Sequence, residues 1–278
     1  MNKKYTYSSA LTIAGFDGSG GAGIQADIKT FSALGCYATS VLTALPVQNT
    51  QGVLSIYPIP YQAVAEQIEA IMDDIFPGAI KIGMVHTAEL VATIVATLQK
   101  YPAVPLVFDP VMVATSGHKL IEDATIQAII EKLFPIASVI TPNMDEAAIL
   151  AGMPIKTLDD MYVAGEKILA LGCQSLLLKG GHLDLPLITS LYFDGHGNIH
   201  PFEFEKYPTN NTHGSGCTLS SAIAAYIAQG KSLFDAVSLG QTYVHKAILH
   251  GANVAIGKGN GPLNHFFHPQ KLTKNEMV

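Results

Sequence analysis

The chain has 278 residues, of which 49% are hydrophobic and 14% charged, and its formal net charge is −6. This composition excludes an intrinsically disordered chain, and without a basic block we expect no nucleic-acid partner. No apolar run is long enough to span a bilayer and no signal peptide is evident, so we expect no membrane partner and a cytoplasmic location. Three scattered cysteines without metal-ligand spacing agree with a reducing compartment.

Short apolar runs alternate with segments of helical periodicity, and no long linker or repeat interrupts them. We therefore expect an α/β fold with one domain over residues 1–278 and a mostly parallel sheet covered on both faces. Strands are expected at 10–14, 39–46, 80–84, 106–108, 138–140, 175–178, 187–193 and 199–207. Helices are expected at 23–34, 63–75, 88–98, 124–133, 146–151, 161–171, 217–228 and 233–249.

The first glycine-rich segment runs from Gly15 to Gly23, after an expected strand and before an expected helix. Its spacing matches GxGxxG, which is typical of dinucleotide-binding proteins. Such a site also expects an acidic residue about 20 positions later to hold the ribose. No Asp or Glu occurs between Asp27 and Glu66, which disfavours that interpretation. The glycines instead suit close approach of backbone to a flat ring, or simply a tight turn.

Three polar residues end expected strands: Asp109, Asn143 and Lys179. Ligands of open α/β sheets bind beyond the carboxyl ends of the strands, so we expect the site there. Asp109 and Glu146 offer the hard oxygen ligands that suit Mg²⁺ between ATP phosphates. The alternative is that Asn143 and Glu146 only cap a helix. Lys179 is expected to act as a point charge on phosphates, although a strand-end lysine is otherwise an ordinary exposed residue.

The most informative segment is Asn211–Thr218, directly before an apolar helix. Its glycines allow backbone N–H groups to converge at the helix N-terminus, where the unpaired donors and the helix dipole favour an anion. A phosphoryl group in transfer needs such preorganised donors. A cysteine in the first turn, Cys217, is expected to have a lowered pKa. The alternative is a small buried hydrophobe, which we assign to Cys36 and Cys173.

Together these residues resemble the ribokinase-like vitamin kinases, and in particular the hydroxymethylpyrimidine/phosphomethylpyrimidine kinases of thiamine biosynthesis. The resemblance extends from Leu11 to His265, and several separate motifs in the same order make it specific. The motifs are Leu11–Gly15, Ser19–Phe31, Gln48–Val53, Lys81–Met84, Asp109–Met112, Thr141–Asn143, Leu178–His182, Asn211–Gly214 and Gly261–His265.

The resemblance implies a three-layer α/β/α sandwich, usually a homodimer, that uses MgATP to phosphorylate a hydroxymethylpyrimidine and then its monophosphate. Gln48 is implied to pair with the amino and nitrogen edge of the ring, and Cys217 to take the hydroxyl proton. The residues implied to surround the pyrimidine are Gly15, Asp27, Gln48, Met84 and Val111. The anion hole is implied to comprise Gly214, Ser215, Gly216 and Cys217. Lys179 and Asn143 are implied to contact the nucleotide, and Asp109 and Glu146 to organise the metal.

Three positions depart from the family pattern. Phe16 stands where a serine is usual, Ser215 replaces a threonine in the anion loop, and Gln241 occupies a position often held by a nucleotide-side lysine. Phe16 therefore puts the shape of the ring pocket in question, and Gln241 the contacts to ATP.

Pyridoxal kinase is the main alternative, because its ring is of similar size and carries a comparable hydroxymethyl group. The dual-activity members have a lid cysteine where this chain has Ala114, and an apolar residue at the position of Gln48. Both differences favour the pyrimidine, since a hydrogen-bonding site discriminates against a ligand that lacks the partner group. Sugar and nucleoside kinases of this fold are disfavoured because they have an aspartate at the position of Cys217. A non-catalytic vitamin sensor is the alternative from another class.

Overall fold

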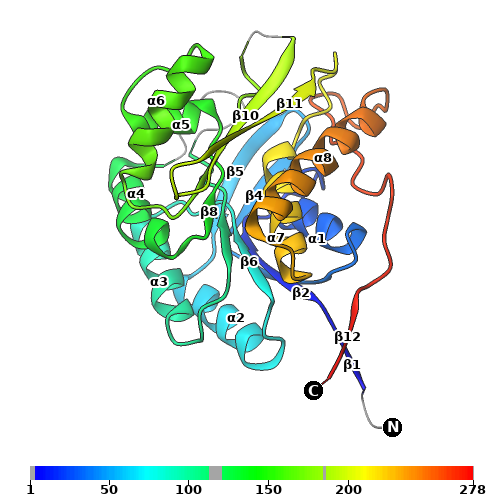
Figure 1. The fold of residues 1–278 in the computed structure, drawn as a ribbon. Coiled ribbons are helices and arrows are strands. Elements are labelled where there is room, and N and C mark those ends of the chain that lie inside the picture. The colour runs from blue at the N-terminus through cyan, green and yellow to red at the C-terminus, as the bar shows by residue number, and fades with distance from the viewer. Residues whose placement is uncertain (1–3, 113–120, 184–185, 278) are drawn as a thin grey trace.

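A computed structural model describes residues 4–112, 121–183 and 186–277 (Figure 1). Within these residues an eight-stranded sheet has the order β11-β10-β9-β8-β7-β6-β2-β3. Its strands are β2 (Ser9–Ala14), β3 (Tyr37–Leu42), β6 (Ala79–Ile82), β7 (Leu106–Phe108), β8 (Val139–Ile140), β9 (Leu176–Leu178), β10 (Leu187–Phe193) and β11 (Ile199–Glu205). Neighbours from β3 to β9 pair in parallel, whereas β10 is antiparallel to both β9 and β11.

Helices cover both faces of the sheet (Figure 1). One layer contains α1 (Gly23–Ala33), α7 (Ser215–Ala228) and α8 (Leu233–Gly251). The other contains α2 (Tyr61–Asp74), α3 (Ala88–Leu98), α4 (Asp123–Ala128), α5 (Met144–Ala151) and α6 (Leu158–Leu169). The expected three-layer α/β/α sandwich with a mostly parallel sheet is therefore confirmed.

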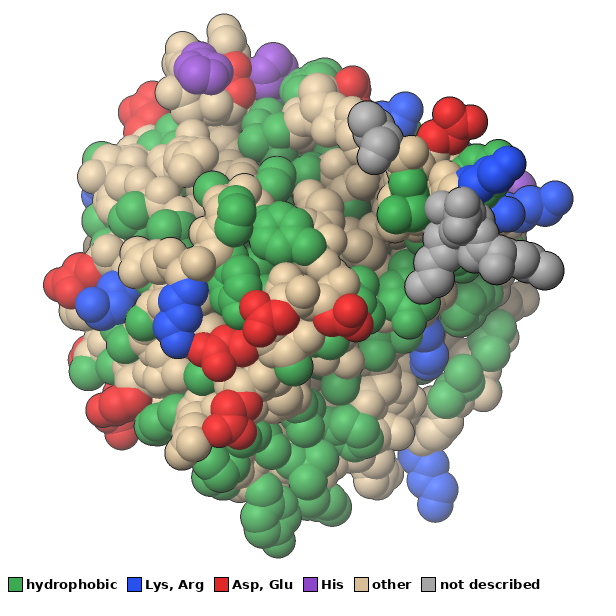
Figure 2. All heavy atoms as spheres, turned by 90° about the horizontal axis from the view of Figure 1, so that it is seen from below, with side chains coloured by type: hydrophobic (Ala, Val, Ile, Leu, Met, Phe, Trp, Pro, Cys, Tyr) green, Lys and Arg blue, Asp and Glu red, His purple; other side chains and the backbone are tan. Residues whose placement is uncertain are grey.

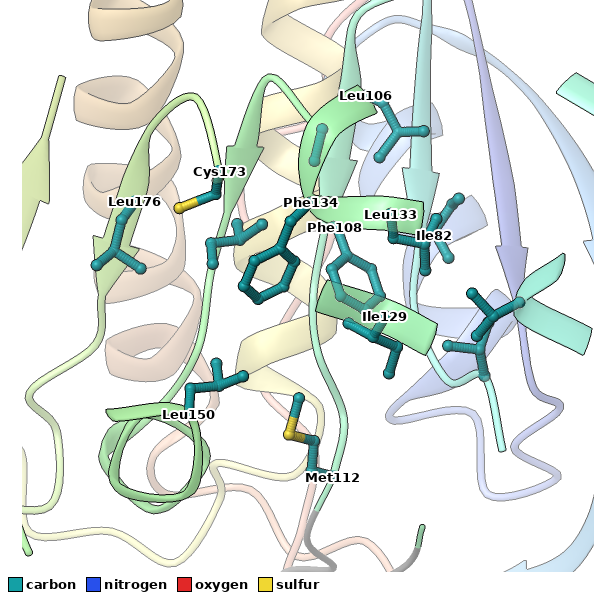
Figure 3. Close-up of a cluster of buried hydrophobic side chains, with 14 of the residues drawn as sticks. Ile82, Leu106, Phe108, Met112, Ile129, Leu133, Phe134, Leu150, Cys173 and Leu176 are labelled. Carbon is teal, nitrogen blue, oxygen red and sulfur yellow. The ribbon is translucent and has the colours of Figure 1, made fainter. Parts of the chain in front are cut away.

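The two helix layers pack on opposite faces because side chains alternate along each strand. On β7, Leu106 and Phe108 face the α2–α6 layer, whereas Val107 faces α1, α7 and α8. Figure 3 shows the first of these cores, where the rings of Phe108 and Phe134 lie with their centroids 6.5 Å apart. All three strand residues are buried, as expected for a central parallel strand.

Two small sheets stand apart from the central one. The hairpin of β4 (Ala44–Asn49) and β5 (Gly52–Pro58) is antiparallel, and every residue of β5 is exposed. The second sheet pairs β1 (Tyr5–Tyr7) with β12 (Lys274–Glu276), so the two ends of the chain lie side by side (Figure 1).

The expected strand 39–46 is in fact two strands, β3 and β4, that belong to different sheets. The expected helix 124–133 begins as α4 but continues as a π-helical turn over Ile129–Leu133. Strands β1, β5 and β12 were not expected.

On the face seen in Figure 2, acidic, basic and apolar side chains are interspersed, and a few basic side chains lie close together at one edge. Among the described residues, no helix is long and apolar enough to cross a membrane.

Candidate active site

The carboxyl ends of β7, β8 and β9 bring polar side chains together. Asp109 follows β7, and its Oδ1 lies 2.9 Å from Lys179 Nζ, which follows β9. The hydroxyl of Thr141, which follows β8, donates to the same oxygen at 3.0 Å. Asn143 forms a parallel bridge with Lys179. The structure thus places Asp109, Asn143 and Lys179 at one edge of the sheet, as the sequence predicts.

Asp109 and Lys179 form a largely buried ion pair, with side chains 3% and 17% exposed. Burial raises the pKa of Asp109, but the Lys179 and Lys81 ammonium groups and the hydrogen bonds from Lys179 and Thr141 together hold that pKa below its ordinary value. Burial lowers the pKa of Lys179, but Asp109 and then Glu146 raise it, and the net direction is upward. Both groups are therefore charged at neutral pH.

Glu146 lies in the first turn of α5 and forms a capping box with Asn143. The Asn143 N–H donates to Glu146 Oε2 at 2.7 Å, and the Glu146 N–H donates to Asn143 Oδ1 at 2.9 Å. The capping role is therefore observed, and it occupies the side-chain oxygen of the expected ATP-binding residue Asn143. Burial raises the pKa of Glu146 to about 7, and the Asp109 carboxylate adds to this effect while Lys179 opposes it.

In the anion loop (Asn211–Thr218), Gly214 has a φ of 80° and precedes Ser215, the first residue of α7. Only glycine adopts this conformation readily, and a Cβ there would also collide with the carbonyl oxygen of Gly21. A Cβ on Gly216 would lie 3.2 Å from Lys179 Nζ and 3.4 Å from Asp109 Oδ2. The first turn of α7 therefore faces the Asp109–Lys179 pair directly.

Asp17 joins the glycine-rich loop to the anion loop, a role that was not predicted from the sequence. Its carboxylate accepts hydrogen bonds from Ser19, Gly21 and Ala22, and lies 2.9 Å from His213 Nε2. Burial raises the pKa of Asp17, but the hydrogen bonds from His213, Ser19, Ala22 and Gln48 together hold that pKa well below its ordinary value. An acidic residue within a glycine-rich turn was the available clue, because Asp side chains often accept backbone hydrogen bonds there.

Cys217 lies in the first turn of α7 and is partly exposed. We expected the helix end to lower its pKa. Instead, burial raises the pKa of the thiol to about 11, and the nearby Lys81 ammonium only partly offsets this. The expectation of a lowered pKa is therefore wrong, and the thiol is mostly protonated at neutral pH.

Three of the five expected ring-binding residues, Gln48, Met84 and Val111, are partly exposed, whereas Gly15 is buried. A Cβ on Gly15 would lie 3.6 Å from Met84 Sδ, so these two residues are neighbours. The Gln48 side chain interacts with Asp17. The fifth residue, Asp27, is fully buried, and its two oxygens are occupied by Lys81, Thr12 and Ser221. This geometry favours a supporting role for Asp27 over direct contact with a ring.

A hollow of about 410 Å³ adjoins the anion loop along the chain. Residues 208–211 and 252–259 line it. The amide nitrogen of Gln241 is buried and has no hydrogen-bond partner within the described part of the chain. Ala114, which bears on the choice between pyrimidine and pyridoxal, lies outside the described residues.

A three-layer α/β/α fold, an anion loop at a helix N-terminus and a strand-end Asp–Lys pair define a small-molecule kinase. The family model described as phosphomethylpyrimidine kinase matches residues 17–264. The chain belongs to the phosphomethylpyrimidine kinase family. It is therefore an enzyme, and the alternative of a non-catalytic sensor is set aside.

Curated relatives agree with this assignment. The hydroxymethylpyrimidine/phosphomethylpyrimidine kinase of Rhizobium meliloti is 45% identical over 258 residues, which cover 92% of this chain and 96% of that protein. A thiamine biosynthesis bifunctional protein of Geobacter sulfurreducens is 44% identical, and the match covers 92% of this chain but only 52% of that longer protein.

Solved structures show the same ribokinase-like fold. A phosphomethylpyrimidine kinase from Clostridium difficile is 44% identical with a TM-score of 0.76, and the match covers 86% of this chain and 99% of that one. The ADP complex of Bacillus subtilis pyridoxal kinase is 35% identical with a TM-score of 0.87, covering 94% of this chain and 98% of that one.

Proposed function

We propose that the chain transfers the γ-phosphoryl group of ATP to the hydroxymethyl group of 4-amino-5-hydroxymethyl-2-methylpyrimidine, and then phosphorylates the monophosphate. The observation that carries this proposal is the position of the first turn of α7. A Cβ added to its Gly216 would lie 3.2 Å from Lys179 Nζ and 3.4 Å from Asp109 Oδ2, so backbone donors, an ammonium and a carboxylate converge where a phosphoryl group would pass. The names of the relatives supply the pyrimidine substrate.

The chain's own residues supply positioning and charge stabilisation, which dominate phosphoryl transfer. Backbone N–H groups of Gly214, Gly216 and Cys217 would stabilise the charge on the transferred group, whereas the Ser215 N–H donates to the Thr212 carbonyl oxygen at 3.1 Å. Lys179 adds a point charge that Asp109 holds in place. Cys217 in its thiolate form takes the proton from the attacking hydroxyl. The hollow lined by residues 208–211 and 252–259 gives room for the remainder of the nucleotide.

Mg²⁺ is part of the proposal, with Asp109 and Glu146 as its protein ligands. The donor set fits a hard cation, because two buried carboxylates lie close enough for Asp109 to raise the pKa of Glu146. The Glu146 oxygen that caps α5 is already engaged, so contact partly through water is expected. Bound Mg²⁺ would neutralise charge on the ATP phosphates.

The test is an ATP-consumption assay with the purified protein against hydroxymethylpyrimidine, its monophosphate, pyridoxal and pyridoxine, with and without Mg²⁺. We expect turnover with both pyrimidines that depends on the metal. Turnover with neither pyrimidine would contradict the proposal.

Pyridoxal phosphorylation is the second candidate activity. It is supported by the pyridoxal kinase from Staphylococcus aureus in complex with AMP-PCP and pyridoxal, which is 33% identical with a TM-score of 0.85. Gln48 favours the pyrimidine, since its amide offers both a donor and an acceptor to the ring edge.

We also propose a single domain over residues 1–278, a homodimer and a cytoplasmic location. The dimer is supported by the apolar side chains that the β4–β5 hairpin exposes, among them Leu54 at 76% and Tyr57 at 59%. The location is supported by the three cysteines, all of which are free.

A further inference from the structure

Lys81, on β6, is fully buried. Its Nζ lies 2.8 and 3.0 Å from the two carboxylate oxygens of Asp27 on α1. The hydroxyls of Thr12 and Ser221 each donate to Asp27 at 2.6 Å. A buried ion pair gains little net stability over apolar residues of the same size, because desolvation of both charges is costly. This pair therefore calls for an explanation beyond stability.

The geometry connects the pair to Cys217 through two helices. Cys217 and Ser221 are four residues apart on α7, and Gly23 and Asp27 are four residues apart on α1, so each couple shares a helix face. Ser221 binds Asp27, and the Gly23 N–H interacts with the sulfur of Cys217. The N-terminal turns of α1 and α7 thus meet at the sulfur, and the ion pair lies one turn deeper along the same contact.

We propose that the buried Lys81–Asp27 pair, tied to α7 by Ser221, is a positioning unit for Cys217 that fixes the sulfur and supplies the opposed charges it faces. The proposal rests on the role of Cys217 in the proposed function. The side chains of Lys81 and Asp27 are fully buried, so they act through Cys217 and not by direct contact with a ligand.

The charged groups that face Cys217 come from four elements. Lys81 on β6 favours the thiolate, and Asp27 on α1 and Asp109 after β7 disfavour it. Lys179, after β9, is itself influenced by Cys217 and favours the thiolate as well. The effect of Lys81 on the pKa of Cys217 exceeds that of Asp27. Removing Lys81 should therefore raise the pKa of the thiol, and removing Asp27 should lower it.

The test measures how fast iodoacetamide labels Cys217, followed by peptide mass spectrometry so that Cys36 and Cys173 do not interfere. Three variants of nearly unchanged shape are compared with the wild type over a series of pH values: Lys81→Met, Asp27→Asn and the double variant. Circular dichroism and thermal unfolding establish which of them fold. Lys100→Met, which breaks the exposed pair of Lys100 with Glu69, is the matched control.

We expect Asp27→Asn to speed labelling on the order of tenfold, because the thiolate becomes the counter-ion of Lys81. Lys81→Met should slow it by a similar factor. The labelling rate of the double variant should fall between those of the wild type and Lys81→Met, because the larger effect of Lys81 and the smaller, opposed effect of Asp27 are lost together. Lys100→Met should label at the wild-type rate. The double variant leaves no unpaired buried charge, so it keeps the ranking testable if a single variant does not fold.

A merely structural role predicts a different result, because loosening the site would speed labelling in both single variants. Changes of the same sign, or no change in any variant, would overturn the proposal. Turnover of Cys217→Ala tests the proposed function separately. If that variant keeps full activity while the labelling order holds, the base role fails and the positioning unit stands.

Discussion

Two buried aspartates near the site show how local context decides the role of a carboxylate. Asp17 accepts backbone and side-chain hydrogen bonds from its own loop and meets His213, so it holds two loops together. Asp27 is fully buried and accepts hydrogen bonds from the Lys81 ammonium and from two hydroxyl groups. The sequence predicts that both are near the site, because both lie in or just after the glycine-rich segment. It does not reveal their partners, which come from residues up to 196 positions away.

Cys217 gives the first prediction. Because burial raises the pKa of its thiol to about 11, the thiolate fraction at neutral pH is small and grows about tenfold with each pH unit below that value. Turnover limited by phosphoryl transfer should therefore increase with pH. Cys217→Ala should lose roughly 10²-fold in turnover and show a flat profile, since general-base assistance is absent. Steady-state kinetics over a pH series check this. Near-normal turnover in the folded variant would leave the backbone donors as the sole catalytic feature.

Gln48 gives a prediction about specificity. Gln48→Met should weaken the use of the pyrimidine by about 1–3 kcal/mol, because the amino and nitrogen edge of the ring loses its partner. Pyridoxal use should suffer less. The ratio of kcat/KM for the two rings, before and after the change, is the measurement. Equal losses for both would show that Gln48 does not contact this edge.

At the scale of elements, helix termini and strand ends hold the site. Helix α5 begins with a capping box, and α7 begins at a glycine in the left-handed region. Both features can be predicted from sequence, because capping residues and glycines have well-defined backbone preferences. The extent of strand β3 cannot, since the apolar run continues smoothly past Thr43 into a hairpin of a separate sheet. Tertiary pairing, not local pattern, divides that run.

Glu146 gives a prediction at this scale. Its folded-state pKa of about 7 lies above the ordinary value of 4.5, so the folded protein holds the proton more tightly than the unfolded chain. Glu146 therefore contributes its full stabilisation below the ordinary pKa. As the pH rises through 7 this contribution is lost, and the free energy of unfolding should fall by roughly 1–3 kcal/mol. Glu146→Gln keeps the cap and should remove this loss. Glu146→Ala also loses the cap and should be less stable than Glu146→Gln by about 1 kcal/mol.

Urea unfolding of both variants at pH values on either side of 7 makes the measurement. A wild-type curve with no slope in this range, or one that rises, would contradict the raised pKa. If Glu146 also organises Mg²⁺, both variants should need more Mg²⁺ for half-maximal turnover, whereas pyrimidine binding without ATP should hardly change.

At the scale of the molecule, the exposed β4–β5 hairpin gives a prediction about assembly. Leu54→Glu should weaken the proposed dimer, because a charge would have to be buried at the interface. Val163→Glu, on α6 and also exposed, is the matched control. Sedimentation equilibrium of both variants distinguishes the cases. A dimer unaffected by Leu54→Glu would place the interface elsewhere.

The antiparallel pairing of β1 with β12 holds the first and last strands of the chain side by side. The Met277 N–H donates to the carbonyl oxygen of Lys4 at 3.0 Å, and Tyr5 lies opposite Glu276. A short peptide bridge between the ends would therefore add little strain to the native state while removing much of the freedom of the unfolded chain. The bridge would also lie at the amino ends of the parallel strands, away from the catalytic edge. We expect a circularised chain to melt at a higher temperature than the linear one, with unchanged kcat.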